Sequence, residues 1–180
     1  MERFFNNAGP IKPELHYHLD LLHRIDWAEV SQLIREERYF VLHAPRQTGK
    51  TSTLLAIMKT LNASGHYACA YANIEGAQAA RGDETKGIPA ACDALVNAIN
   101  LYVGTPELVQ WYAANKATIA PQHLLTQVLQ QWAQLSSKPT VLLLDEVDAL
   151  VGDTLISLLR QIRAGYAQRP EHFPQSIILC

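Results

Sequence analysis

The chain has 180 residues, of which 48% are hydrophobic and 18% are charged, and its formal net charge is −2. A chain of this size and composition can bury one substantial core, as a globular domain does. The small net charge and the sequence pI of about 6.4 exclude a broad basic surface, so nucleic-acid binding is not indicated for this segment.

Cysteine usage and the apolar pattern bear on the cellular compartment. The three cysteines, Cys69, Cys92 and Cys180, are widely separated and form no Cys-x-x-Cys pair. Such thiols suggest a reducing compartment. No apolar stretch is long enough to cross a membrane, and the first residues lack the apolar region of a signal peptide. We therefore expect a cytoplasmic protein with no membrane partner.

The first 38 residues are expected to form a unit of their own, an irregular segment followed by one helix. Two prolines and a glycine between Ala8 and Pro13 disfavour regular structure. Asp26 predicts the N-cap of a helix over about 27–35, with Glu29 as its capping partner. Residues 39–180 then form the core domain.

Apolar strand candidates alternate with helical stretches along the core. The expected strands are 39–43, 67–74, 140–144 and 176–179, and the expected helices are 50–61, 90–102, 106–115, 121–135 and 154–166. Asp153 is the expected N-cap of the last helix, and the polar segment 76–89 is expected to be a mobile surface loop. The alternation predicts an α/β fold with a parallel sheet.

A phosphate-binding loop is predicted where the first strand meets the next helix. Ala44-Pro45-Arg46-Gln47-Thr48-Gly49-Lys50-Thr51 has the P-loop spacing in the strand–loop–helix context that the pattern requires, although Ala44 stands where glycine is usual. Gly49 allows the backbone to approach the phosphates, Lys50 supplies a full positive charge, and the Thr51 hydroxyl is a candidate Mg²⁺ ligand. The candidate nucleotide-binding residues are Pro45, Arg46, Gln47, Thr48, Gly49, Lys50, Thr51 and Ser52. A coincidental turn at the start of a helix is the alternative interpretation.

The apolar strand 140–144 ends in two carboxylates, Asp145 and Glu146. Strand C-termini of a parallel sheet face the ligand, so Asp145 is expected to bind Mg²⁺ with Thr51. Glu146 is the candidate general base for an attacking water, and Lys50 is the other candidate catalytic residue. A solvated turn is the alternative, and it becomes much weaker when a P-loop precedes it.

Several further residues have both a functional and an ordinary interpretation. Asn73 could contact Glu146, or it could simply bond to backbone at a strand end. Arg160 and Arg163 are candidate arginine fingers toward a neighbouring subunit, or parts of a solvated helix face. Arg46 lies inside the predicted loop, and its charge could contact the γ-phosphate.

Three other sets of residues have less specific interpretations. Glu75, Gln78 and Arg81 could assist a partner step, although ordinary loop polarity explains them equally well. The pair His16 and His18 offers two imidazoles with no further ligands, so zinc is not expected. Trp111, Tyr112 and Trp132 are expected to be core residues or a partner surface.

The motifs together resemble the bacterial AAA-like ATP-binding proteins, relatives of the AAA+, STAND and archaeal-type ATPases. The resemblance rests on residues 6–10, 13–17, 39–51 and 144–148, and it covers nearly the whole chain. It implies a three-layer P-loop NTPase core of the division with an additional strand and a catalytic glutamate, usually with strand order 5-1-4-3-2. It also implies that segment 9–17 folds over the adenine and that an effector domain or protein partner is attached. The chain ends at Cys180 after the fourth strand, so we expect a truncated core.

We therefore expect an ATP-binding protein that uses Mg²⁺ and hydrolyses ATP to drive a switch or motor. Such a protein could act as a homo-oligomer. One alternative is a regulatory scaffold that binds nucleotide without significant hydrolysis. A second alternative is a small-molecule kinase, although such kinases generally lack the Asp-Glu strand ending.

Overall fold

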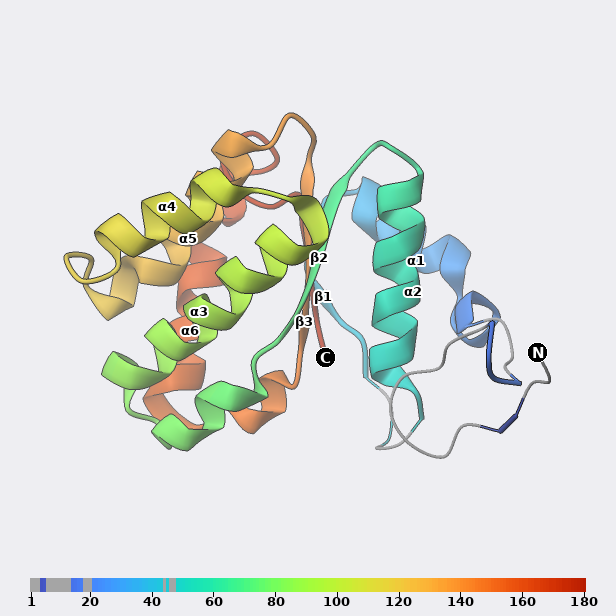
Figure 1. Cartoon of the computed structure of the whole chain (residues 1–180), viewed down its shortest axis with the longest axis horizontal. Coiled ribbons are helices and arrows are strands. Elements are labelled where there is room, and N and C mark those ends of the chain that lie inside the picture. Colours follow the sequence, from blue (N-terminus) through green and yellow to red (C-terminus); the bar gives the residue numbers. More distant parts are fainter. Residues whose placement is uncertain (1–3, 6–13, 18–20, 44, 46–47) are drawn as a thin grey trace.

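The computed structural model describes residues 4–5, 14–17, 21–43, 45 and 48–180. In this part of the chain, a parallel sheet lies between two layers of helices (Figure 1). The strands are β1 (Phe40–Val41), β2 (Ala68–Asn73), β3 (Thr140–Asp145) and β4 (Ser176–Leu179), in the order β1-β4-β3-β2. The α/β fold with a parallel sheet is confirmed, and the order agrees with the 1-4-3-2 part of the expected arrangement.

The register of the two buried strands places their polar ends side by side. β2 and β3 pair over their full lengths, from Ala68 opposite Thr140 to Asn73 opposite Asp145. Alternate residues of a strand face opposite sides of a sheet. Asp145 therefore lies on the same sheet face as Tyr71, two residues before the end of the neighbouring strand.

Helices α1 (Trp27–Arg35) and α2 (Lys50–Ala63) cover one face of the sheet (Figure 1), together with the short 3-10 helix η1 (Leu21–Arg24). The boundaries of α1 are those expected from the sequence, and the Asp26 carboxylate accepts the Glu29 N–H at 3.0 Å. Buried side chains of α1, α2, β2, β3 and β4 form one core, whose members are Val30, Ile34, Leu54, Ile57, Met58, Leu61, Cys69, Tyr71, Val141, Leu143 and Ile178.

Four helices cover the opposite face: α3 (Glu84–Val103), α4 (Pro106–Asn115), α5 (Pro121–Leu135) and α6 (Gly152–Ala164). The bounds of α4 and α5 are those expected. Trp132 and Phe173 are completely buried in this second core, and Tyr112 is buried as well. Trp111 packs against the same core while partly exposed. Trp111, Tyr112 and Trp132, which were expected to be either core residues or a partner surface, are therefore core residues.

The expected surface loop at 76–89 is wrong. The 3-10 helix η2 (Glu75–Ala80) follows β2 directly, and α3 already begins at Glu84. Asp83 caps α3 by accepting the Thr85 N–H at 3.0 Å. Gly87, which suggested a break in the chain, is instead buried where α3 packs closely on Thr154. Tertiary packing therefore determines the structure of this segment, against the local preference of its glycines.

Two boundaries at the ends of elements also differ from expectation. β1 is shorter than 39–43, although the Leu42 N–H still bonds to the Leu179 carbonyl at 2.8 Å. Asp153 is not the N-cap of α6, because Val151 holds that position and Asp153 lies within the first turn. The short 3-10 helices η3 (Val147–Ala149) and η4 (Tyr166–Gln168) flank α6.

The N-terminal segment contributes one isolated bridge to the described structure. Phe4 and His16 pair in parallel, and their rings meet edge to face at 4.8 Å. Most of the segment 9–17 that was expected to cover an adenine lies outside the described residues, as does His18, so that expectation remains a prediction. The division into 1–38 and 39–180 also remains a prediction. None of the described helices combines the length and apolar character needed to cross a membrane.

Candidate nucleotide-binding site

The site is built where the first turn of α2 approaches the carboxyl end of β3. The Thr51 hydroxyl donates a hydrogen bond of 2.7 Å to Oδ2 of Asp145. Thr51 lies on α2 and Asp145 is the last residue of β3, so the contact joins two elements that are distant in the sequence. The structure thus brings together the two residues that the sequence analysis assigned to one metal ion.

The beginning of α2 differs from that of its neighbours. Gly49 holds the N-cap position with φ of 83°, a left-handed conformation that favours glycine, and the first turn contains no acidic residue. By contrast, α1 and α3 begin with Asp26 and Asp83, whose carboxylates accept first-turn N–H groups. Lys50 adds a positive charge to an end that already carries partial positive charge. Such a helix end favours an anion from outside the helix.

Asp145 is a buried carboxylate that accepts hydrogen bonds from Thr51, Tyr71 and Glu146. It is 1% exposed. Oδ2 accepts the Tyr71 hydroxyl at 2.9 Å as well as Thr51, and Oδ1 accepts the Glu146 N–H at 3.1 Å. Burial, and next the hydrogen bond to Asp145, raise the pKa of Tyr71 well above its ordinary value, so the phenol remains a donor.

Tyr71 was missed by the sequence analysis. The residue lies in an apolar strand, where a tyrosine most often contributes to the core. Only the register of β2 against β3 shows that its hydroxyl reaches the last residue of the next strand. The available sequence signal was the position of Tyr71, a tyrosine two residues before the end of the strand β2.

Glu146 takes an unusual backbone conformation directly after Asp145. Its φ is 62°, which is rare for a residue with a side chain and often accompanies a functional site. The chain then turns, and the Val147 N–H donates to the Cys180 carbonyl at 2.9 Å. The Glu146 side chain is half-buried, and among the described residues it has no hydrogen-bond or ion-pair partner. Its carboxylate is therefore available to another group.

Cys180 lies next to this turn, at the carboxyl end of the sheet. Its N–H donates to the Leu144 carbonyl at 2.8 Å. Burial, and next the negative charge of Asp145, raise the pKa of the Cys180 thiol to about 11, while Lys50 opposes the shift. The thiol is therefore neutral at physiological pH.

The residues at this end of the sheet suit Mg²⁺ together with a phosphate group. Mg²⁺ prefers oxygen ligands and commonly takes one or two from protein, with substrate phosphates and water completing its coordination. Thr51 and Asp145 supply a hydroxyl and a carboxylate. No arginine or lysine among the described residues forms an ion pair with Asp145. A buried carboxylate without a cation is unfavourable, and a divalent ion would compensate it.

A family comparison identifies the class of protein to which this arrangement belongs. The model of the ATPase family associated with various cellular activities (AAA) matches residues 40–169, more than half of the chain. The chain belongs to the AAA family. ATP binding is a property of this family, and the expected membership in an AAA-like P-loop ATPase family is confirmed. A search of curated proteins found no match.

The rest of the predicted AAA phosphate loop is only partly described. Thr48 bonds through its hydroxyl to the Pro45 carbonyl at 2.7 Å, which closes a local turn before Gly49. Ser52 follows Thr51 in the first turn of α2 and is buried. Ala44, Arg46 and Gln47 lie outside the described residues, and their expected roles remain predictions.

Asn73 does not bond to Glu146 in the described structure. Its side-chain oxygen instead accepts the Glu75 N–H at 2.8 Å, two residues further along. This contact stabilises the turn after β2, as the ordinary interpretation of a strand-end asparagine anticipated. A switch role for Asn73 in this AAA domain therefore remains a prediction that no contact supports.

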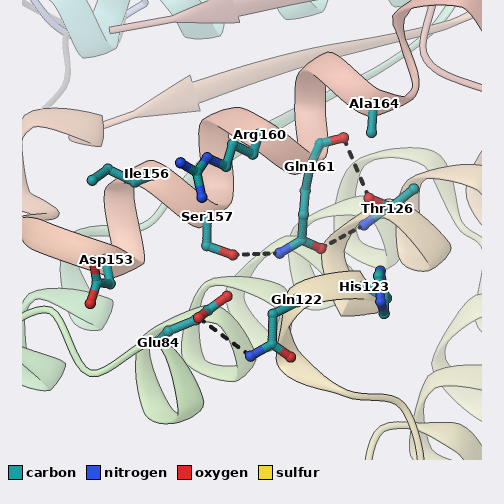
Figure 2. A pocket seen from close by; sticks show the side chains of 10 residues that line it. All are labelled: Glu84, Gln122, His123, Thr126, Asp153, Ile156, Ser157, Arg160, Gln161 and Ala164. Atoms are coloured by element: carbon teal, nitrogen blue, oxygen red, sulfur yellow. Dashed lines mark hydrogen bonds between the residues drawn. The ribbon is translucent and has the colours of Figure 1, made fainter.

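Arg160 and Arg163 lie on the exposed side of α6, and neither makes an ion pair with a described residue. Arg160 contributes to a cavity of about 490 Å³ between α6 and the first turns of α3 and α5. Figure 2 shows the Gln161 side chain at the base of this cavity, between Ser157 and Thr126. The Gln161 amide donates to the Ser157 hydroxyl at 3.0 Å and accepts the Thr126 N–H at 3.2 Å. The cavity lies on the helical layer opposite α2, so it is separate from the nucleotide site.

A second depression lies beside the carboxyl ends of β2 and β3. Glu75, Gln78 and Arg81 line it together with Ala149 and Val151, and its volume is about 600 Å³. The three polar residues that were grouped on their sequence positions are therefore gathered on one surface. Nothing in their contacts distinguishes a partner site from an ordinary polar surface.

Proposed function

We propose that this AAA domain binds ATP with Mg²⁺ at the junction of α2 and β3 and hydrolyses it to drive a switch or motor. The hydrogen bond between Thr51 and Asp145 carries the proposal. It joins the phosphate-loop helix to the acidic strand end, and these two elements must meet if one metal ion is to contact both.

The nucleotide is held by groups at the start of α2. Gly49 permits the close approach of the backbone, and the Lys50 ammonium neutralises charge on the β- and γ-phosphates. Thr51 and Asp145 would hold Mg²⁺, which supplies positive charge to the phosphates when it is bound. The remaining expected contacts come from Pro45 to Thr48 and from Ser52.

Glu146 supplies the chemistry that distinguishes hydrolysis from simple binding. Its carboxylate is half-buried, beside Asp145, and without a hydrogen-bond partner in the described part of the chain. It takes a proton from a water whose oxygen attacks the γ-phosphorus, while the bond to the β–γ bridging oxygen breaks and ADP leaves. Because no acceptor other than water is required, this arrangement favours hydrolysis over transfer to a small molecule.

Replacing Glu146 with glutamine tests the proposal. Glu146→Gln keeps the shape of the side chain but removes the base, and we expect turnover to fall by about 10²–10⁴-fold while ATP affinity is retained. Phosphate release measures turnover, and titration calorimetry measures affinity. Glu171→Gln, at an exposed position on the surface, is the matched control and should leave both quantities unchanged.

The outcomes separate the proposed ATPase from a regulatory scaffold. A wild-type chain that binds ATP but releases no phosphate above background would support the scaffold instead. Equal turnover in wild type and Glu146→Gln would show that Glu146 is not the base.

A further inference from the structure

The hydroxyl of Tyr71 is the one side-chain group of β2 that the described structure places on Asp145. The O–O distance is 2.9 Å, within the usual range for a hydroxyl donating to a carboxylate. Tyr71 is 9% exposed, and its ring meets Tyr102 of α3 edge to face at 6.4 Å. The phenol is therefore held by packing on one side and by the carboxylate on the other.

The position of the hydroxyl has a consequence for the geometry of Asp145. Oδ2 accepts the hydroxyls of both Thr51 and Tyr71, whereas Oδ1 accepts the N–H of the next residue, Glu146. Two donors from different elements, one on α2 and one on β2, fix the plane of the carboxylate. Tyr71 is therefore the donor that links this carboxylate to the neighbouring strand β2.

We propose that Tyr71 is a positioning residue that holds Asp145 in the orientation required for metal binding. The inference rests on the proposed Mg²⁺–ATP site. Residues that hydrogen-bond a metal ligand orient it, and their loss commonly weakens metal binding by about 10- to 100-fold. Tyr71 acts through Asp145 and need not touch the metal or the nucleotide.

The first test measures how much Mg²⁺ is needed for nucleotide binding. Tyr71→Phe removes one oxygen and keeps the ring in its packed position. We expect the Mg²⁺ concentration for half-maximal ATP binding to rise by about tenfold. ATP binding measured in excess EDTA should change by less than about twofold, because the metal is then absent from both proteins.

Tyr112→Phe is the matched control. Tyr112 is also a buried tyrosine, and its hydroxyl donates to the Pro89 carbonyl at 3.3 Å in the core on the opposite face of the sheet. The substitution removes the same atom far from Asp145, so the Mg²⁺ requirement should be that of wild type. An equal rise in both variants would overturn the assignment, because it would reflect general loosening of the fold.

A double-mutant comparison tests whether Tyr71 acts through Asp145. In an Asp145→Asn background, adding Tyr71→Phe should produce no further change in the Mg²⁺ requirement. A full additional tenfold effect in that background would mean that Tyr71 acts by another route, and it would overturn the proposal.

A second measurement needs only the wild-type chain, in case Tyr71→Phe does not fold. Tyrosine is labelled with ¹³C at the hydroxyl-bearing carbon, and Mn²⁺ replaces Mg²⁺ in the presence of ATP. At least one tyrosine signal should broaden strongly, since the Tyr71 phenol lies beside the metal-binding carboxylate. Unbroadened signals for all tyrosines would overturn the metal site at Asp145 and, with it, the role of Tyr71.

The results also distinguish the failure of this inference from failure of the proposed function. A wild-type chain that binds no nucleotide with or without Mg²⁺ overturns both. A wild-type chain with Mg²⁺-dependent binding, matched by Tyr71→Phe, overturns the role of Tyr71 alone.

Discussion

The Thr51 hydroxyl donates a hydrogen bond of 2.7 Å to the Asp145 carboxylate, although the two residues lie 94 positions apart in the sequence. The contact joins α2 to β3 at the carboxyl end of the sheet. It also places a hydroxyl and a carboxylate oxygen where one small cation could contact both.

Thr51→Val should weaken Mg²⁺-dependent ATP binding, because the variant keeps the branched shape of the side chain and loses the oxygen. We expect the Mg²⁺ requirement to rise by about tenfold or more, as for loss of a metal-site contact. Thr51→Ser, which retains the hydroxyl, is the control and should stay close to wild type. Calorimetry at several Mg²⁺ concentrations measures the effect, and equal behaviour of the two variants would contradict it.

Lys50→Ala should reduce ATP affinity whether or not Mg²⁺ is present, since it removes a full positive charge from the start of α2. Loss of a charge-assisted hydrogen bond costs about 1.5–3 kcal/mol, which corresponds to about a 10- to 100-fold weaker binding. Lys59→Ala, at an exposed position later in the same helix, controls for charge and helix content. Unchanged ATP affinity in Lys50→Ala would reject the phosphate-loop assignment.

Gly87→Ala should destabilise the fold even though alanine is the better helix former. A Cβ at Gly87 would lie 2.4 Å from Cγ2 of Thr154 on α6, too close for any real contact. Overpacking of this kind costs about 1–3 kcal/mol, and the helix propensity of alanine returns at most about 1 kcal/mol. Thermal or denaturant unfolding measures the net loss.

Two companion variants show whether the cause is steric. Gly76→Ala places a Cβ in open space and should change stability by less than about 0.5 kcal/mol. Thr154→Ala, added to Gly87→Ala, removes the colliding methyl group together with a hydroxyl that has no hydrogen-bond partner among the described residues. The double variant should recover stability, and a purely additive loss would refute the steric explanation.

Asn62→Ala should destabilise the outer edge of the sheet at β2. The Asn62 side chain accepts the Cys69 N–H at 2.8 Å and donates to the Cys69 carbonyl at 2.9 Å. It therefore satisfies both backbone groups of a buried residue on an edge strand. Leaving both unpaired should lower the free energy of unfolding by about 2–4 kcal/mol. Asn97→Ala, on the exposed side of α3, is the control, and an equal loss there would contradict the explanation.

Much of the fold could be predicted from local patterns. The bounds of α1, α4, α5 and β4 follow from caps and apolar periodicity, because these signals are carried by neighbouring residues. The segment 76–89 could not be predicted in this way. Position 87 requires glycine because Thr154, more than sixty residues later in the sequence, packs against it. A local signal for a break was overridden by close packing between two helices.

The sequence by itself determined the chemical groups of the candidate site and the class of fold, since the spacing around Gly49 and Lys50 and the apolar strand before Asp145 are local features. The pairing of Thr51 with Asp145 was expected from these motifs, but only the tertiary structure decided that Tyr71 joins them. The parallel register of β2 and β3 brings Tyr71 to the carboxylate of Asp145. The packing of α2 against the carboxyl end of β3 brings Thr51 to the same carboxylate. Strand register depends on the packing of whole sheet faces, so no pattern within β2 or β3 could have specified the contact between Tyr71 and Asp145.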